Sequence, residues 1–193
     1  MPKGKRGIKA GTGRKNTKAK RDSIEYALAN ANPNYNKGKE YQYNCQRCVV
    51  AYALLRRGED VEALPEIKGD TTSHHWQEFF ENQQWEPVKI NKLARPLSDR
   101  QQETQTNIEN EVKSWGDGSI GIVYVQWSKN QGAHVFNVEN VNGKVRFVDA
   151  QDGTTDVSKY FKGIRANNKT TLLSRVDNLK PNPKYIDKVV KKK

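Results

Sequence analysis

The chain has 193 residues, of which 34 are Lys or Arg and 22 are Asp or Glu, so its formal net charge is +12. No apolar run approaches the roughly 20 residues that a membrane-spanning helix needs, and no apolar segment follows the basic first residues as a Sec-type signal requires. The two cysteines are too few and too close for a disulfide framework, which favours a reducing compartment or a thiol kept free for chemistry.

The positive charge is concentrated at the two ends. Residues 1–21 carry nine Lys or Arg and no acidic residue, residues 180–193 carry six Lys and one Asp, and the part between has slightly more acid than base. This pattern predicts a basic, disordered arm at 1–21, a domain at 22–179 and a basic C-terminal tail at 180–193. Such tails are typical either of contacts with nucleic acid through its phosphates or of plain solvated ends.

The first half of the chain predicts helices. Apolar residues at helical spacing favour a helix over 22–31, and Asn32-Pro33 breaks it. A second helix is expected to begin after Asn44, to carry both cysteines and to end at Gly58. Four further elements are expected before residue 116: a short strand over 60–65, a helix from Ser73 to about residue 83, an irregular or edge segment at 85–88, and a polar helix over 98–115.

The second half predicts an antiparallel sheet. Runs rich in Val, Ile, Phe and Tyr are separated by turn residues, and they favour strands over 120–127, 133–141, 144–149 and 172–176. Asn142-Gly143 stands between two of these runs and is a strong hairpin signal. Helices followed by such a sheet indicate the α+β class.

A Cys–His–Asp site can be predicted from this arrangement. A cysteine in the first turn of a helix lies at the positive end of the helix dipole, which favours the thiolate. His134 begins one predicted strand and Asp149 ends the next, and in a hairpin through Asn142-Gly143 facing residues have numbers that sum to about 285. His134 then faces position 151, within two residues of Asp149. A carboxylate there would orient the imidazole, whose other nitrogen could take the proton of a thiol.

Four segments together resemble one known family. They are Asn44–Tyr52 around the cysteines, Arg57–Ala63, Gly132–Phe136 around the histidine and Val148–Gly153 around the aspartate. They are similar to the papain-fold toxin family, whose members are glutamine deamidases of bacterial polymorphic toxins and of modules attached to phage head-morphogenesis proteins. The resemblance covers roughly residues 32–153 and leaves out the basic tails. Ala133 and Ala150 stand where the family usually has Gly and Pro.

The resemblance implies a papain-like fold and a cysteine-dependent amidohydrolase that acts on a glutamine side chain of a target protein, without a cofactor or metal. His134 would be the general base and then the general acid, and Asp149 would orient it. Gln42 or Asn44 would help to bind the oxyanion, and Gln151 would support the His–Asp pair. The implied setting is an effector delivered into a target cytoplasm or a phage particle, with an immunity protein as a further partner.

The sequence leaves the choice of nucleophile open. Asn44 as the cap puts Cys45 in the first turn, where the dipole effect is largest. Gln42 precedes Cys48 by six residues, which is similar to the spacing of the oxyanion glutamine and the nucleophile in papain. Cys48 also begins an apolar run, as a buried structural cysteine would.

Other functions use the same residues or the tails. A protease or transglutaminase would need the same three side chains. Zinc bound by the two cysteines with His74 and His75 matches no common ligand spacing. The alternative from a different class is a structural or packaged virion protein, in which a papain-like core is anchored to nucleic acid or to the virion interior by the basic arms.

Overall fold

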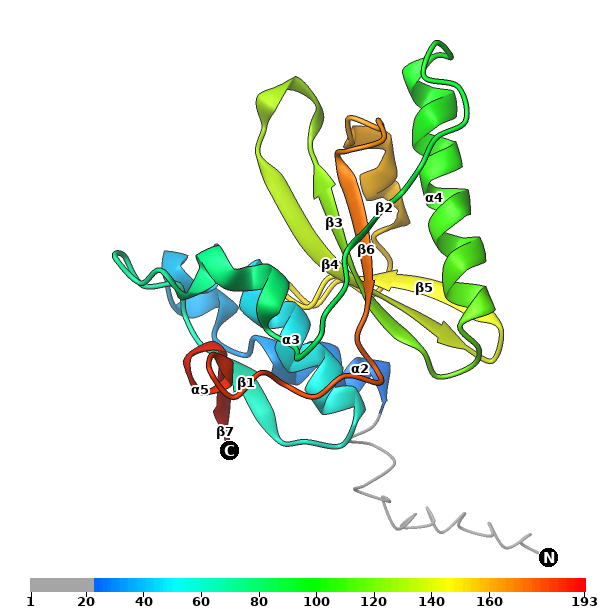
Figure 1. The fold of residues 1–193 in the computed structure, drawn as a ribbon. Helices are drawn as coiled ribbons and strands as arrows, with labels where there is room; N and C mark the ends of the chain where they lie inside the picture. Colours follow the sequence, from blue (N-terminus) through cyan, green and yellow to red (C-terminus); the bar gives the residue numbers. More distant parts are fainter. Residues whose placement is uncertain (1–22) are drawn as a thin grey trace, which may run out of the picture.

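The structure, a computed structural model, describes residues 23–193, so the arm predicted at 1–21 lies outside the described residues. Its central element is a five-stranded sheet with the order β2-β6-β3-β4-β5, in which all neighbours are antiparallel (Figure 1). The strands are β2 (Glu86–Pro87), β3 (Ile120–Gln126), β4 (Ala133–Val141), β5 (Lys144–Val148) and β6 (Thr171–Arg175).

The two faces of this sheet belong to two hydrophobic cores. Successive side chains of a strand point to opposite faces. In β3, Ile122 belongs to the core that contains the cysteine helix, whereas Val123 belongs to the second core. In β4, Val135 belongs to the core of the cysteine helix, and Phe136 belongs to the second core. The alternation of apolar residues in these strands therefore serves two layers of helices, one on each side.

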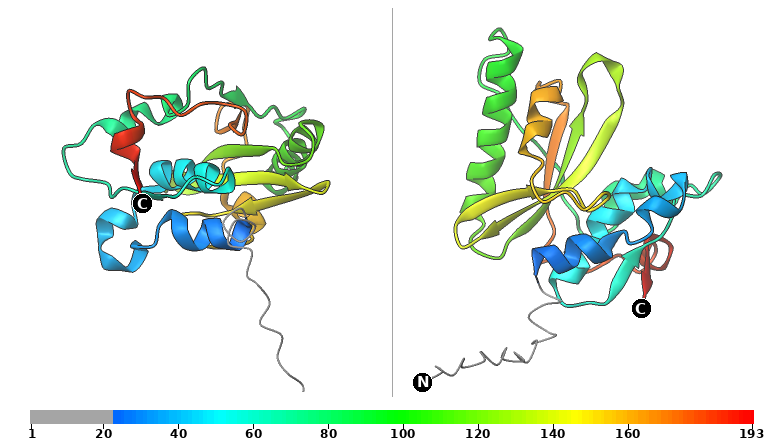
Figure 2. Two further views of the ribbon diagram at one scale, coloured as in Figure 1. Left: turned by 90° about the horizontal axis from the view of Figure 1, so that it is seen from below. Right: turned by 180° about the vertical axis from the view of Figure 1, so that it is seen from behind.

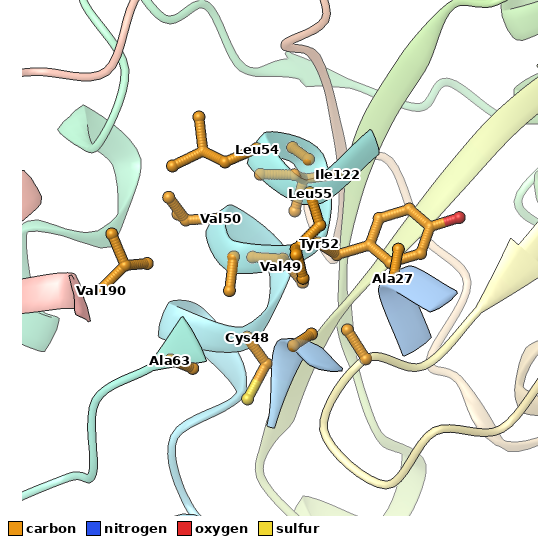
Figure 3. Close-up of a cluster of buried hydrophobic side chains, with 14 of the residues drawn as sticks. Ala27, Cys48, Val49, Val50, Tyr52, Leu54, Leu55, Ala63, Ile122 and Val190 are labelled. Atoms are coloured by element: carbon orange, nitrogen blue, oxygen red, sulfur yellow. The ribbon is translucent and has the colours of Figure 1, made fainter. Parts of the chain in front are cut away.

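The first layer holds helices α2 (Ile24–Ala31) and α3 (Cys45–Arg56). Ser23 caps α2 by accepting a hydrogen bond from the backbone N–H of Tyr26, 3.1 Å long. Every residue of α3 from Arg47 to Leu55 is buried, so this helix is covered on all sides. Figure 3 shows its side chains packed among residues of α2, β3 and two short strands, β1 (Val61–Ala63) and β7 (Val190–Lys192). The residue after its C-cap, Gly58, adopts a φ of 86°, as expected for a glycine that ends a helix.

The second layer holds α4 (Leu97–Ser114) and the 3₁₀ helix η5 (Ser158–Gly163). The few apolar residues of α4 include Ile108 and Val112, which are completely buried against the second core together with Phe161 of η5. The two views of Figure 2 show α4 standing beside the sheet, away from α2 and α3. None of the helices within residues 23–193 has the length and apolar character needed to cross a bilayer.

Most of the predicted elements are confirmed, and so is the α+β class. Helix α3, the polar helix α4 and the strands β3 to β6 begin and end within a few residues of the expected positions. The hairpin register is also confirmed, because Asn137 pairs with Val148 and Val141 pairs with Lys144, both with numbers that sum to 285.

The helix predicted from Ser73 to about residue 83 is wrong in kind and length. The structure has a 3₁₀ helix, η3 (Thr72–Glu78), with a kink at His75. Ser73 does not cap it, because its hydroxyl donates to the carboxylate of Glu66 instead. Phe79 and Phe80 are buried as expected, but they lie just after the helix.

The C-terminal segment, expected beyond the domain as a basic tail, is packed on the folded body. It forms the one-turn helix α5 (Ile186–Val189) and the strand β7 (Val190–Lys192), which pairs with β1 (Val61–Ala63). Tyr185, Val189 and Val190 are buried in the first core. The lysines of this segment are mostly exposed, and composition alone could not reveal the apolar residues between them.

We expect the change Val189→Ala to lower the free energy of unfolding by about 2 kcal/mol, since it leaves a cavity beside α3. The neighbouring change Lys188→Ala is the matched control, because that side chain is exposed. Urea denaturation followed by circular dichroism measures both. Equal midpoints for the two variants would contradict the packing of this segment.

Candidate active site

The nucleophile candidate Cys45 is the first residue of α3. Asn44 occupies the N-cap position as predicted, but its side chain makes no capping hydrogen bond. The first backbone N–H groups of α3 that find an acceptor among residues 23–193 are those of Arg47 and Cys48, which both bond to the carbonyl oxygen of Asn44. The N–H groups of Cys45 and Gln46 precede these two at the positive end of the helix dipole.

His134 and Asp149 form a hydrogen-bonded pair. His134 is the second residue of β4, and Asp149 directly follows β5, where it makes an isolated bridge to Thr154. The distance from His134 Nε2 to Asp149 Oδ2 is 2.7 Å, and both side chains are largely buried. Because Nε2 faces the carboxylate, the other ring nitrogen, Nδ1, is the one left to face a thiol. The hairpin register thus brings together the two residues that the sequence paired.

Charge and hydrogen bonding raise the pKa of His134 to about 10. Burial alone would lower it from the ordinary value of 6.5. The hydrogen bond to Asp149, together with the electrostatic influence of Asp149 and of the nearby Cys45, outweighs the burial. The raised pKa favours the protonated imidazolium, with Asp149 as its hydrogen-bond partner, whereas the Cys45 thiol donates to Gln46 Oε1 over 3.4 Å.

Tyr160, on η5, is a fourth member of the site, which no sequence pattern indicated. Its hydroxyl donates to Asp149 Oδ2 over 2.8 Å, so this oxygen accepts hydrogen bonds from both Tyr160 and His134. Burial and the neighbouring Asp149 raise the pKa of the phenol well above its ordinary value, which keeps it a donor. The rings of Trp127 and Tyr160 also flank the imidazole, with centroid distances of 6.1 Å and 5.9 Å.

The change Tyr160→Phe should lower the free energy of unfolding by about 1–2 kcal/mol, because a buried carboxylate loses one of its donors. The ring packing stays the same. Tyr124→Phe is a suitable control, since its hydroxyl only accepts a hydrogen bond from the neutral amide of Gln126. Chemical denaturation of both variants tests this. An equally small decrease in the free energy of unfolding of the two variants would argue against the role of the Tyr160 hydroxyl.

Cys48 has a very different environment from Cys45. It is completely buried, and its thiol donates to Asn44 Oδ1 over 3.2 Å, whereas Cys45 is partly exposed. Burial and the nearby Cys45 raise the pKa of the Cys48 thiol well above its ordinary value. Figure 3 shows Cys48 within the cluster of apolar side chains around α3. These features favour Cys45 as the reactive thiol and Cys48 as a packing residue.

The three predicted support residues lie around the site but differ from expectation in what they contact. Gln42 is exposed, and its amide donates to the carbonyl of Tyr35 over 3.3 Å. The amide of Asn44 is completely buried and donates to the carbonyl of Leu64 over 3.0 Å, so this side chain is engaged inside the protein and not with a ligand. Gln151 supports Asp149 through its main chain, whose N–H donates to Asp149 Oδ1 over 2.9 Å.

The histidine pair lies elsewhere. His74 and His75 are exposed on η3, and the ring of His75 stacks on Tyr185 at a centroid distance of 5.0 Å. In the part of the chain that the structure describes, no group of three or more His, Cys, Asp or Glu residues could hold a metal ion.

Comparison with known proteins gives one match. The model of the family described as papain fold toxin 1, glutamine deamidase, matches residues 43–154, which include α3, His134 and Asp149. No curated protein and no solved structure matches the chain. The matched segment spans more than half of the sequence and contains the paired His134 and Asp149 as well as both cysteines. The chain therefore belongs to this family of papain-fold glutamine deamidase toxins.

Proposed function

We propose that this protein deamidates a glutamine side chain of a target protein, with Cys45 as the nucleophile, His134 as the acid and base, and Asp149 as the group that orients His134. The observation that supports this proposal is the 2.7 Å contact between His134 Nε2 and Asp149 Oδ2, together with the pKa of His134, which Asp149 and Cys45 raise. An imidazolium beside a cysteine sulfur is the arrangement in which cysteine nucleophiles are activated.

The first half of the reaction forms a thioester. The Cys45 thiolate attacks the carboxamide carbon of the glutamine, and the carbonyl oxygen becomes an oxyanion. The backbone N–H groups of Cys45 and Gln46, at the start of α3, are the proposed oxyanion donors. His134 then gives its Nδ1 proton to the amide nitrogen, and ammonia leaves.

The second half regenerates the enzyme. His134, now neutral, takes a proton from a water molecule, and the hydroxide attacks the thioester carbon. Collapse of the second tetrahedral intermediate releases glutamate and the thiolate, and His134 again carries the proton. Asp149 accepts the Nε2 hydrogen bond throughout, which holds one tautomer and stabilises the imidazolium.

The test uses the purified protein with a cell proteome as substrate. We expect release of ammonia together with peptides in which a glutamine has become glutamate, detected by mass spectrometry, and neither product with the Cys45→Ala variant. New peptide ends without deamidation would indicate a protease, and isopeptide cross-links would indicate a transglutaminase. Either result, or the absence of any product, would overturn the proposal.

A further inference from the structure

Asn32 joins two parts of the proposed site that are far apart in the sequence. It follows α2 directly, and its position before Pro33 predicts only the end of a helix. The residue is 6% exposed, so its side chain lies inside the protein. A buried carboxamide needs hydrogen-bond partners, and those partners show what the side chain does.

The amide nitrogen of Asn32 donates to two main-chain carbonyls. One belongs to Tyr41, in the segment that leads into α3, and the other belongs to Gln151, 119 residues further along the chain; both distances are 2.8 Å. These two bonds use both hydrogens of the NH₂ group. The side chains of Asn32 and Asn44 also face each other, with a nitrogen–oxygen distance of 3.4 Å in each direction.

Two of these partners, Asn44 and Gln151, adjoin residues of the proposed site. Asn44 immediately precedes Cys45. The N–H of Gln151 donates to Asp149 Oδ1, and Asp149 in turn holds His134. The carboxamide of Asn32 is thus the direct connection between the start of α3 and the turn that carries Asp149.

We propose that Asn32 is a positioning residue that sets the separation between Cys45 and the His134–Asp149 pair. The role rests on the proposed function, because it concerns the same site. Without this amide, two partly buried carbonyls lose their donor, and the turn after β5 can move away from α3. A displacement of about 1 Å at a reacting centre can lower a rate by about a hundredfold. Asn32 lies outside the segment that matches the family model.

The experiment separates positioning from simple stabilisation. The variants Asn32→Ala and Asn32→Asp both remove the NH₂ donors, and the second nearly keeps the shape of the side chain. The matched control is Asn137→Ala. Asn137 is also completely buried, and its amide donates to the carbonyl of Val49 in α3 over 3.1 Å, without contacting the site. All proteins carry Cys48→Ala, so that iodoacetamide reports on Cys45 alone.

Two readouts are compared in folded protein: the rate of Cys45 alkylation as a function of pH, and the rate of deamidation. We expect both Asn32 variants to alkylate at neutral pH at least about tenfold more slowly than the parent, because Cys45 is no longer held against the His134–Asp149 pair. Their deamidation should fall in parallel. Asn137→Ala should lose stability but keep the parental pH profile.

The positioning role would be overturned if the Asn32 variants alkylate Cys45 at the same rate as the parent. It would also be overturned if the alkylation rate falls by the same factor in Asn137→Ala. Should Asn32→Ala not fold, Asn32→Asp decides in the same way. The proposed function can fail separately: rapid, Asn32-dependent alkylation of Cys45 without deamidation of any glutamine would leave the positioning role in place and exclude the deamidase.

Discussion

The change Cys45→Ala is expected to abolish deamidation, with a loss of at least about 10⁴-fold, whereas Cys48→Ala should keep most of the activity. Cys45 begins α3, is partly exposed and acts on the charge of His134. Cys48 is completely buried, and its thiol donates a hydrogen bond to Asn44 Oδ1. Replacing Cys48 removes one buried sulfur and should cost about 1 kcal/mol of stability.

The measurement for this pair is the rate of ammonia release with equal amounts of folded protein. Trapping of the thioester, seen as a mass increase of the intact enzyme after acid quenching, gives a second readout that depends on the nucleophile alone. The opposite pattern, with Cys48→Ala inactive and Cys45→Ala active, would assign the nucleophile to Cys48 and would fit the Gln42 spacing that is similar to papain.

The local patterns of the sequence were sufficient for much of the fold and for the core of the site. Asn142-Gly143 determines the hairpin, the hairpin determines the register, and the register brings His134 close to Asp149. Each step depends on residues that are near one another in the chain, so it can be followed without the structure. The position of Cys45 relative to this pair could come only from the resemblance to the family.

The contacts that the sequence could not predict are those between distant segments. Tyr160 comes from η5, a short 3₁₀ helix without a periodic pattern, and its hydroxyl meets Asp149 only because η5 packs on the second core. Asn32 looks like a simple helix breaker until the structure brings Gln151 beside it. No signal within either segment indicates its partner.

Asn44 shows how tertiary contacts override a local preference. Asn is among the best N-cap residues, yet here its side chain turns inward to Leu64, Asn32 and Cys48. The N–H groups at the start of α3 are then left without a side-chain cap, which is where the proposed reaction needs donors. In this arrangement the amide of Asn44, which the resemblance implied as an oxyanion donor, is bonded to Leu64 and faces Asn32.

Tertiary contacts also connect the C-terminal segment to a buried charge in α3. Arg47 of α3 is 1% exposed and is neutralised by ion pairs with Asp70, at 2.8 Å, and Glu66, at 3.4 Å. Its guanidinium also donates to the carbonyl of Lys188 in α5. The helix that carries both cysteines is therefore attached to residues that composition had separated as a tail. For the virion alternative, the lysines of this segment are still exposed, and the basic arm predicted at 1–21 lies outside the described residues.

The change Asp149→Asn should lower the deamidation rate by about 10³–10⁴-fold, because an amide neither stabilises the imidazolium nor holds the required tautomer. It should also move the alkaline limit, which is the pH above which the deamidation rate falls. In the parent protein, Asp149 and Cys45 raise the pKa of His134 to about 10, so activity should persist until the pH approaches that value. Without the carboxylate, burial of the ring counts for more, and the alkaline limit should shift toward the ordinary value of 6.5.

Asp149→Asn should also change how the stability of the fold depends on pH. The folded-state pKa of His134 lies above its ordinary value, so protonation of His134 stabilises the fold fully below pH 6.5, and this stabilisation is lost as the pH rises to about 10. The urea midpoint of the parent should therefore decrease as the pH rises between these two values. The midpoint of Asp149→Asn should decrease less over the same range. Asp156→Asn is the control, since the carboxylate of Asp156 is exposed and accepts from the N–H of Ser158. An unshifted alkaline limit in Asp149→Asn, measured beside that control, would mean that Asp149 does not set the charge of His134.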